Sequence, residues 1–541
     1  MKRREFIQVS SLGSLSTLLL NGNSVKAFSK TTYLNNIPDS IIDGRTLVMI
    51  QLNGGNDGLN TIIPLNQYDA YANLRPTIKI KNTGLNSAIE LDSTLPLDQQ
   101  ILLHPSLTGF KELYDAGKLN IIHGVGYPSI NKSHFAATSI LLKGGDGTLA
   151  NSNKTSGWMA RYLNSNYDYT QYSDPLGIQL GSQKPSVGFE SQHEHRIDIN
   201  LTSQDISGFY DTVSNIGTPK PSSVPDTEYG ENISFINNIE SSTNSYSKRI
   251  SEVFDAGSNS NVVYPNYDLA NQLKTVAKMI KGGSKTKIFL VSIKGFDNHS
   301  GQVSSSQDSH LGIHADLLTT VGDSVKAFQD DLEALGIDEK VVTATFTEFG
   351  RKPIENGNLG TDHGNLGPMF VIGKHVNAGV SGTNLDLSNV SKHYDEVNLQ
   401  HDYRQVFTTL IDDFLGASPS AIENTEFTDY SGDQKLNLIV DNQKSENNLA
   451  VDTILEETIS FYPNPVYEGH CTIKYKSRET LRGFVVMYDL KGQLVFQMVQ
   501  DFDYGMNVKT LNIEHLKEGV YILAIKDTNN KTLKTVKVVK R

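Results

Sequence analysis

The middle of the chain, from residue 46 to 440, alternates short apolar runs with longer amphipathic ones. Several runs are almost continuously apolar, as strands buried on both faces of a parallel sheet are. These runs are TLVMIQL, LNIIHGVGY, KTKIFLVSI, VVTATFT and PMFVIG. Helical spacing of apolar residues marks NYDLANQLKTVAKMIKGG and HADLLTTVGDSVKAFQDDLEALG, each just upstream of a strand-like run. The pattern predicts an α/β core with a doubly wound, mostly parallel sheet.

The pattern changes near the end of the chain. Residues 441–457 are polar and irregular, which is typical of a linker. From residue 458 to 541, short alternating runs are separated by turn residues. These runs are CTIKY, RGFVVMYDL, GQLVFQMV, GVYILAI and TLKTVKVVKR. Short strands at regular spacing predict a small C-terminal β-sandwich.

Residues 458–541 also carry ordered motifs: FYPNP, YDLKGQLV, LNIEHLKEGVYIL and a basic KVVKR end. In this order they closely resemble the type A C-terminal sorting domain of the type IX secretion system. The residues that carry the resemblance are Pro463, Asn464, Pro465, Gly492, Leu516, Gly519, Val520 and Tyr521. The resemblance implies recognition by the type IX machinery and delivery to the cell surface or extracellular space, without a catalytic role. The alternative is an unrelated adhesive β-module.

The first 27 residues are typical of an export signal. Arg3 and Arg4 form a basic start, a modestly apolar stretch follows, and residues 25–27 (Val-Lys-Ala) fit a small-residue cleavage site. RREFI resembles a twin-arginine signal, which implies export of a folded core; an ordinary Sec signal is the alternative. No later stretch reaches the roughly 20 apolar residues of a membrane span, so we expect no transmembrane segment.

The charge and the cysteine count of the chain exclude several classes of function and of metal site. The net charge of -12 and the pI near 5.6 argue against a nucleic-acid-binding surface, which needs a basic face. The single cysteine, Cys471, excludes an intramolecular disulfide framework and a cysteine-ligated zinc site. Any metal must therefore bind to Asp, Glu and His side chains.

Acidic and imidazole side chains follow or precede nearly every predicted strand. They are Asp57, His134, Asp297, His299, Glu348, Asp362 and His363, with Ser133 at the start of an expected helix. In open α/β sheets ligand groups gather at the carboxyl ends of the strands. So many charges in one crevice would repel one another unless a cation compensated them. We therefore predict a divalent metal site, with zinc, manganese, magnesium and calcium all open; the alternative is hydrogen-bonded structure.

Six motifs across the core resemble the bacterial family called domain of unknown function 1501. They are NGGNDGLNTIIP, YPSINKSHF, SGWMARYL, GFDNHSGQ, TEFGRKPIENG and GTDHGN. Beyond that family, the layout resembles the alkaline phosphatase superfamily, including its sulfatases. This resemblance implies that Ser133 is the nucleophile and that the metal ligands are Asp57, Asp297, His299, Glu348, Asp362 and His363.

Three departures from the superfamily pattern leave the metal count open. One residue separates Asp297 from His299 where the superfamily has three, and Phe349 follows Glu348 where a His is expected. No Cys or Ser stands in the formylglycine sulfatase pattern.

Three residues have alternative roles. Ser133 is either a nucleophile or a helix N-cap. Arg351 is either a guanidinium clamp for an anionic ester or a structural salt-bridge partner. His134 is either an acid or base or a core histidine.

These features predict an exported metal-dependent hydrolase of phosphate or sulfate esters, with a small anionic ester or glycan as substrate. The first alternative is a catalytically inactive surface protein that binds glycans or anions on the same scaffold. A second alternative is an envelope or assembly component without a small ligand.

Overall fold

The computed structural model describes most of the chain. The described residues are 18–20, 23–25, 44–149, 154–167, 172–182, 185–191, 198–201, 246, 248–440 and 459–541, the last without 463–465, 468, 478–480, 490, 503–504 and 529–531. They fall in two compact units, 1–444 and 445–541. The predicted export signal lies outside the described residues apart from two short paired strands, β1 (Leu18–Leu20) and β2 (Asn23–Val25). The predicted linker 441–457 lies outside them entirely.

The first unit is built on one large sheet. Its order is β15-β7-β14-β11-β3-β10-β8-β9, with β16 paired to β7. The bounds are β3 Thr46–Asn53, β7 Leu119–Gly126, β8 Gly177–Leu180, β9 Asp198–Leu201, β10 Ile288–Lys294, β11 Val341–Phe346, β14 Gly367–Ile372, β15 Gly379–Ser381 and β16 His401–Asp402. The predicted apolar runs are thus confirmed as strands, and the fold is α/β with a mostly parallel sheet.

Strand β14 corrects one expectation. The run PMFVIG was predicted as a parallel strand, but β14 pairs antiparallel with both β11 and β7. The remaining pairs of this sheet are parallel. An apolar run buried on both faces does not reveal its direction, because burial looks the same from either end.

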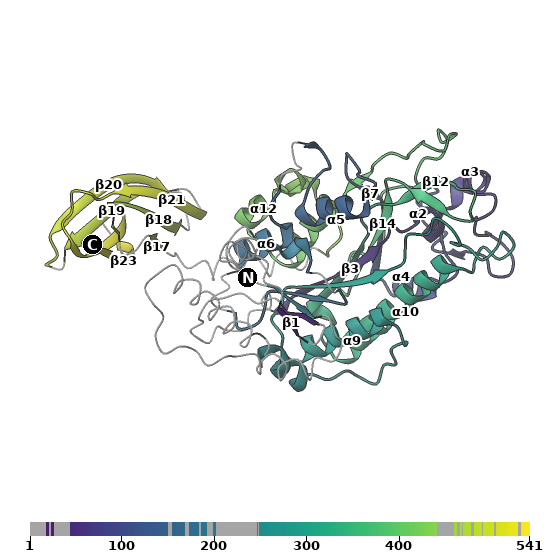
Figure 1. The fold of residues 1–541 in the computed structure, drawn as a ribbon, viewed down its shortest axis with the longest axis horizontal. Coiled ribbons are helices and arrows are strands. Elements are labelled where there is room, and N and C mark those ends of the chain that lie inside the picture. Colours follow the sequence, from purple (N-terminus) through teal and green to yellow (C-terminus); the bar gives the residue numbers. More distant parts are fainter. Residues whose placement is uncertain are drawn as a thin grey trace, which may run out of the picture. The chain divides into compact units, whose positions relative to one another are not determined.

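Helices cover both faces of the sheet (Figure 1). One face packs on α4 (Thr108–Asp115), α9 (Asp268–Lys281) and α10 (Ile313–Ala334). The opposite face packs on α5, α6, α11, the π-helix η8 and α12. Their bounds are His134–Lys143, Trp158–Asn166, Tyr403–Thr409, Leu410–Phe414 and Pro419–Thr425.

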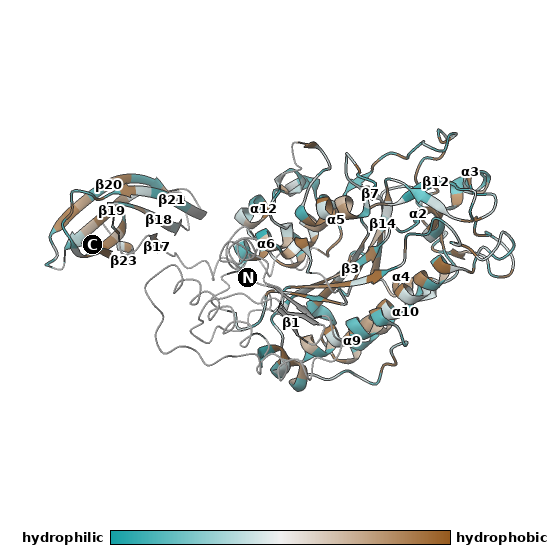
Figure 2. Cartoon of the chain, viewed as in Figure 1, coloured by the Kyte–Doolittle hydropathy of each residue, from teal (hydrophilic) through white to brown (hydrophobic). Residues whose placement is uncertain are grey.

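Alternate residues of β3 explain this layering. Val48 and Ile50 join the cluster with α9 and α10, whereas Leu47 and Met49 join the cluster with α5 and α6. All four side chains are fully buried, and the strand is coloured as hydrophobic in Figure 2. Among the described residues, no helix combines the length and the apolar character that crossing a bilayer requires.

Smaller elements frame one end of the sheet. They are α2 (Gly58–Thr61), β4 (Ile62–Pro64), α3 (Tyr68–Leu74), β5 (Ile89–Glu90), β6 (Ile101–Leu103), β12 (Arg351–Glu355) and β13 (Thr361–His363). Single 3-10 turns occur at Leu65–Gln67, Val187–Phe189, Asp338–Lys340, Thr428–Tyr430 and Gly432–Gln434. The hairpin of β12 and β13 pairs Arg351 with His363 and so presents the predicted Asp-His pair next to the sheet.

The second unit is a two-sheet β-sandwich, as predicted. One sheet has the order β17-β18-β21 and the other β20-β19-β22-β23. The bounds are β17 Ile459–Tyr462, β18 His470–Ser477, β19 Leu481–Asp489, β20 Leu494–Phe502, β21 Gly505–Asn512, β22 Gly519–Asp527 and β23 Thr532–Lys540. Ile473 and Leu511 of one sheet share a core with Met487 and Leu523 of the other.

A buried lysine closes this sandwich. Lys540 is 9% exposed, and its Nζ donates to the carbonyl oxygens of Ile513, Glu514 and Leu516 at 2.8, 2.8 and 2.5 Å. Lys540→Met would remove this donor from all three oxygens, and only the bond from Leu516 N to Ile513 O is known to remain, so we expect the second unit to lose about 1–3 kcal/mol of stability. Hydrogen exchange of β22 and β23 in the full chain measures this loss. Lys517→Met, at an exposed position, is the control; equal exchange in both variants would contradict the prediction.

Candidate metal centre

The sheet brings distant loops to one edge. The parallel register pairs Asn53 of β3 with Lys294 of β10, and Gln51 of β3 with Phe346 of β11. The loops that follow these three strands therefore start side by side. Because β14 runs in the opposite direction, the residues before it reach the same edge, among them His363.

Three imidazoles point their Nε2 atoms at one carboxylate. Asp297 Oδ1 lies 3.1 Å from His363 Nε2 and 3.2 Å from His299 Nε2, and its Oδ2 lies 3.3 Å from His134 Nε2. The Nε2 atoms of His299 and His363 are 2.9 Å apart. Ligand atoms of His134, Asp297 and His363 all fall within 4.8 Å of one another. The arrangement is that of side chains around a common centre.

The far nitrogens of two of these rings are held by carboxylates. His134 Nδ1 lies 2.8 Å from Glu348 Oε1, and His299 Nδ1 lies 2.9 Å from Asp362 Oδ1. An ionised carboxylate only accepts hydrogen bonds, so each Nδ1 carries the proton. In the neutral imidazole the Nε2 lone pair then faces inward. A carboxylate behind a histidine is the usual support of a metal ligand.

The third ring is held in the same way. His363 Nδ1 lies 2.8 Å from the backbone oxygen of Lys132, which also can only accept. Its Nε2 lone pair therefore also faces Asp297. Burial lowers the pKa of His363, so its neutral form is favoured.

The three inward Nε2 lone pairs repel one another and the negative charge of Asp297 unless a cation lies between them. His134 Nε2 is buried and has no hydrogen-bond partner among the described residues, so this atom in particular lacks a donor. A divalent ion would satisfy all of these atoms at once, and three His with one Asp is a donor set suited to zinc. The residues present therefore fit a metal ion.

Both acidic groups of the cluster are held ionised. Burial would raise the pKa of Asp297, but the hydrogen bond and the positive charge of Arg351 outweigh it and lower the pKa to about 2. Burial is likewise outweighed at Asp362, where hydrogen bonds from Asn356, His299 and His393 lower the pKa to about 2. Neither carboxylate needs to lose a proton before a cation binds at neutral pH.

Two glycines allow the loops to meet. Gly54 has φ of 122°, and a Cβ there would lie 2.3 Å from the backbone nitrogen of Asp297. A Cβ on Gly364 would lie 2.2 Å from the backbone carbon of Arg351. Any larger residue at either position would push the loops apart.

The structure gives two predicted ligands a different position. Glu348 is 3% exposed, and its Oε1 accepts from Gly54 N at 2.8 Å as well as contacting His134. Asp362 spans His299 and His393, with His393 Nε2 2.8 Å from Asp362 Oδ2. Both carboxylates thus stand behind histidines, on the side away from the shared centre.

Asp57 is placed away from the cluster. Its Oδ2 lies 2.6 Å from Arg75 Nη1 and accepts from Gln302 Nε2 at 2.5 Å. Arg75 is fully buried and also donates to the backbone oxygens of Lys352 and Pro353. Asp57 was predicted as the first-strand ligand, but here it balances a buried guanidinium, because the chain turns into α2 directly after it.

Arg351 differs from the predicted substrate clamp. Its side chain is fully buried, and its Nε and Nη1 donate to Gly55 O and Thr361 O, each at 2.8 Å. Nη2 contacts Asp297 Oδ1 at 2.8 Å and the backbone oxygen of Gly54. Every guanidinium nitrogen is engaged within the protein. Arg351 is thus a structural salt-bridge partner, the second of its two predicted roles, and its partner is Asp297.

Ser133 is the N-cap of α5 and is exposed. Its hydroxyl makes no cap hydrogen bond, while its backbone N–H donates to Asn131 Oδ1 at 2.9 Å. His134, predicted as an acid or base, instead points its Nε2 into the cluster.

His393 and Arg75 were not predicted from the sequence. His393 lies in a loop without strand or helix pattern, 31 residues after Asp362. Arg75 is the C-cap of α3, between Leu74 and Pro76. Neither position carries a motif or spacing that could have found it.

Asp362 and Glu348, the two carboxylates behind the histidines, are expected to strengthen metal binding without contacting the ion. Asp362→Asn and Glu348→Gln keep the shape but no longer fix the protonated Nδ1, because an amide can donate as well as accept. Loss of such support typically weakens metal affinity by about 10–100-fold. Competition with a chromogenic chelator measures this, with Glu355→Gln as the control, since Glu355 binds the backbone of Thr77 and Ile78. Unchanged affinity in both variants would contradict the assignment.

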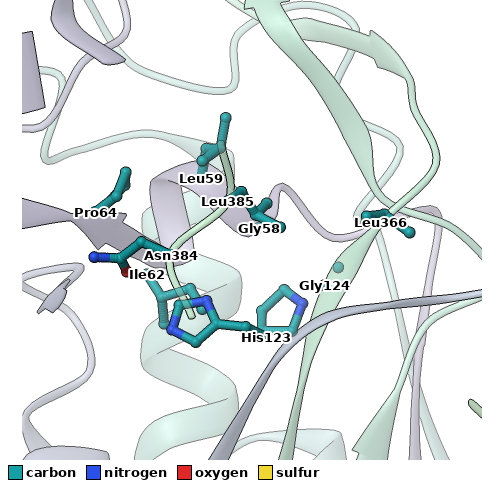
Figure 3. A pocket seen from close by; sticks show the side chains of 11 residues that line it. Gly58, Leu59, Ile62, Pro64, His123, Gly124, Leu366, Asn384 and Leu385 are labelled. Atoms are coloured by element: carbon teal, nitrogen blue, oxygen red, sulfur yellow. The ribbon is translucent and has the colours of Figure 1, made fainter. Parts of the chain in front are cut away.

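The described residues line a cleft at the cluster and a much smaller pocket that no side chain of the cluster borders. A cleft of about 440 Å³ is bordered by His134, Asp297 and Glu348 and is large enough for a substrate group. A pocket of about 10 Å³ beside His123 and Asn384 holds no more than a water molecule. Figure 3 shows the His123 ring and the Asn384 side chain at this smaller pocket. Of these two, only the cleft borders the cluster and has room for a substrate group.

A match to a protein family model shows which family this chain belongs to. The family model described as protein of unknown function (DUF1501) matches residues 45–411. The chain belongs to the DUF1501 family. A secretion system C-terminal sorting domain matches residues 460–540 of this DUF1501 protein. The predicted resemblances to this family and to the sorting domain are confirmed, and the protein is secreted by the type IX system to the cell surface or extracellular space.

Solved structures add only distant similarities to this DUF1501 protein. PorZ, a surface component of the type IX system of Porphyromonas gingivalis, is 18% identical with a TM-score of 0.12, over 15% of this chain and 11% of PorZ. The chain thus spans about a tenth of PorZ. An alkaline phosphatase superfamily protein from Vibrio parahaemolyticus is 9% identical with a TM-score of 0.33, covering 95% of this chain and 92% of that one.

The PsFucS1 sulfatase from Pseudoalteromonas sp. is 10% identical with a TM-score of 0.32, covering 86% and 83% of the two chains. No curated protein matches the DUF1501 chain significantly.

Proposed function

We propose that this DUF1501 protein is a divalent-metal-dependent hydrolase of phosphate or sulfate esters that acts at or beyond the cell surface. The observation that carries the proposal is the convergence of His134, His299 and His363 on Asp297, each ring fixed from behind. These four side chains would hold the ion. A bound divalent ion supplies Lewis acidity and lowers the pKa of an adjacent hydroxyl or water.

The chain's own residues supply the rest. Arg351 and Glu348 hold the proposed metal ligands Asp297 and His134 in place. Ser133 offers an exposed hydroxyl at the N-terminus of α5, where the helix dipole favours developing negative charge. Lys294 stands at the adjoining cleft and has no ion-pair partner among the described residues, so it is available to an anionic ester. Ser133 is our candidate nucleophile.

Metal analysis of the purified full chain, with a screen of phosphomonoesters, phosphodiesters and sulfate esters, tests the proposal. We expect a stoichiometric transition metal, zinc first, and turnover that a chelator abolishes. A metal-free chain, or turnover that persists unchanged after chelation, would overturn it.

Serine variants separate a nucleophile from an N-cap. Ser418 caps α12, and its side chain accepts from Ala421 N at 3.2 Å, so Ser418→Ala should cost about 1 kcal/mol of stability and leave turnover unchanged. Ser133→Ala should leave the unfolding midpoint unchanged, because its hydroxyl makes no cap bond, and should abolish turnover. Thermal unfolding and ester hydrolysis measure the two effects. Full activity in Ser133→Ala would remove this residue from the mechanism.

One observation favours the alternative of a surface binding protein. Among the described residues, no hydrogen bond joins the Ser133 hydroxyl to the four metal-binding side chains. A chain that binds a metal ion and an anionic ligand with no turnover of any ester would establish that alternative.

A further inference from the structure

The cleft beside the metal centre has a polar floor in an otherwise apolar sheet. On one face, β3 changes from Leu47 and Met49 to Gln51 and Asn53 toward its carboxyl end. The neighbouring strand β10 changes in step, since Ser292 pairs with Gln51 and Lys294 with Asn53. A strand face that is covered by a helix along its whole length is usually apolar along its whole length. The change therefore marks a surface built to face a polar ligand.

Gln51 makes the strongest case. The residue is only 7% exposed, yet its amide makes no hydrogen bond among the described residues and lines the cleft. A ligand that displaces water from this amide without replacing its hydrogen bonds would lose about 1–3 kcal/mol of binding free energy. An amide both donates and accepts, so it matches a group that does both.

The wall of the cleft is one face of α5. Phe135, Thr138, Ser139 and Leu142 follow each other at helical spacing and all line the cleft. The Phe135 ring is 86% exposed, one residue beyond His134 of the metal centre. An exposed aromatic ring beside hydroxyl groups is suited to a ligand with both an apolar face and polar edges.

We propose that this cleft binds the sugar part of the substrate, a saccharide that carries a sulfate or phosphate ester. Sugar hydroxyls donate and accept, as Gln51 and the cleft hydroxyls require, and the C–H face of a pyranose packs on Phe135. Lys294 matches the negative charge of the ester, and Asp297 of the metal centre also lines the cleft. An aliphatic ester would leave the Gln51 amide unpaired. The inference rests on the proposed function for the ester, while the sugar recognition rests on the cleft alone.

The test uses the full chain and arrays of neutral, sulfated and phosphorylated oligosaccharides, with and without chelator. We expect binding to sulfated or phosphorylated saccharides, at least tenfold weaker in Phe135→Ala and in Gln51→Leu. Leu85→Ala removes a side chain that is 88% exposed outside the cleft and serves as the matched control. Comparison of binding to the sulfated and the phosphorylated oligosaccharides shows which ester the cleft accepts.

Each outcome separates the two proposals. Metal-dependent hydrolysis of an aryl sulfate or phosphate, without saccharide binding in either metal state, would overturn the sugar inference and leave the hydrolase standing. Saccharide binding that depends on Phe135, in a chain that holds no metal, would overturn the proposed hydrolase and leave the sugar inference standing. Binding unaffected by both Phe135→Ala and Gln51→Leu would also overturn the inference, because Phe135 is exposed and its loss does not threaten folding.

Discussion

Asp297→Asn is expected to weaken binding of the divalent ion by more than about 100-fold, beyond the loss typical of a supporting carboxylate. The variant keeps the shape of the side chain but removes the negative charge on which three imidazoles converge. Ester turnover should disappear with the metal. Metal content after dialysis against a weak chelator, and hydrolysis of the best ester substrate, measure both effects.

Asp297 also pairs with the buried Arg351, so its loss lowers stability as well. His299→Ala avoids this complication, because His299 is exposed on 44% of its side chain and supports no buried charge. It should lose the metal, and its unfolding should differ little from that of the metal-free native chain. Asp308→Asn, in an exposed stretch of the same loop region, is the matched control and should retain both metal and activity. Retention of metal by both Asp297→Asn and His299→Ala would refute the proposed centre.

Asp57→Asn is expected to destabilise the core by about 3–5 kcal/mol, the usual result of breaking a buried ion pair. The Arg75 guanidinium would remain buried with its charge unbalanced. The folded fraction should still bind metal normally. Urea unfolding and metal analysis of the same samples check both parts, with the exposed Asp69→Asn as control. Lost metal at unchanged stability would instead make Asp57 a ligand, as the family resemblance implied.

The pH dependence of Asp57 follows from its environment. Burial would raise its pKa, but the charge and hydrogen bond of Arg75, with His314 and Gln302, outweigh burial and lower the pKa below 3.8. A lowered carboxyl pKa contributes stability above the unfolded-state value, and that contribution is lost as the pH falls below it. The stability gap between the native chain and Asp57→Asn should therefore narrow below about pH 4.

Much of the candidate site was visible in the sequence as residue types at strand ends. Asp297, His299 and His363 were predicted as ligands, and the structure brings them within 3.2 Å of one another. Their roles relative to Glu348 and Asp362 were not predictable. Whether a carboxylate lies in front of an imidazole or behind it depends on side-chain direction, which loop sequence does not encode.

The sequence by itself determined the α/β class, the C-terminal sandwich with its sorting motifs, and the list of groups able to bind a cation, because periodicity and residue chemistry are local properties. Only the tertiary structure decided that β14 runs antiparallel and so delivers His363 to the site. It also decided that Asp57 pairs with Arg75 and that Gln51 faces an open cleft. These three features depend on which segments, far apart in the sequence, pack against one another. The free energy of burial that favours one packing over another is a sum over the whole core, so no local stretch of sequence contains it.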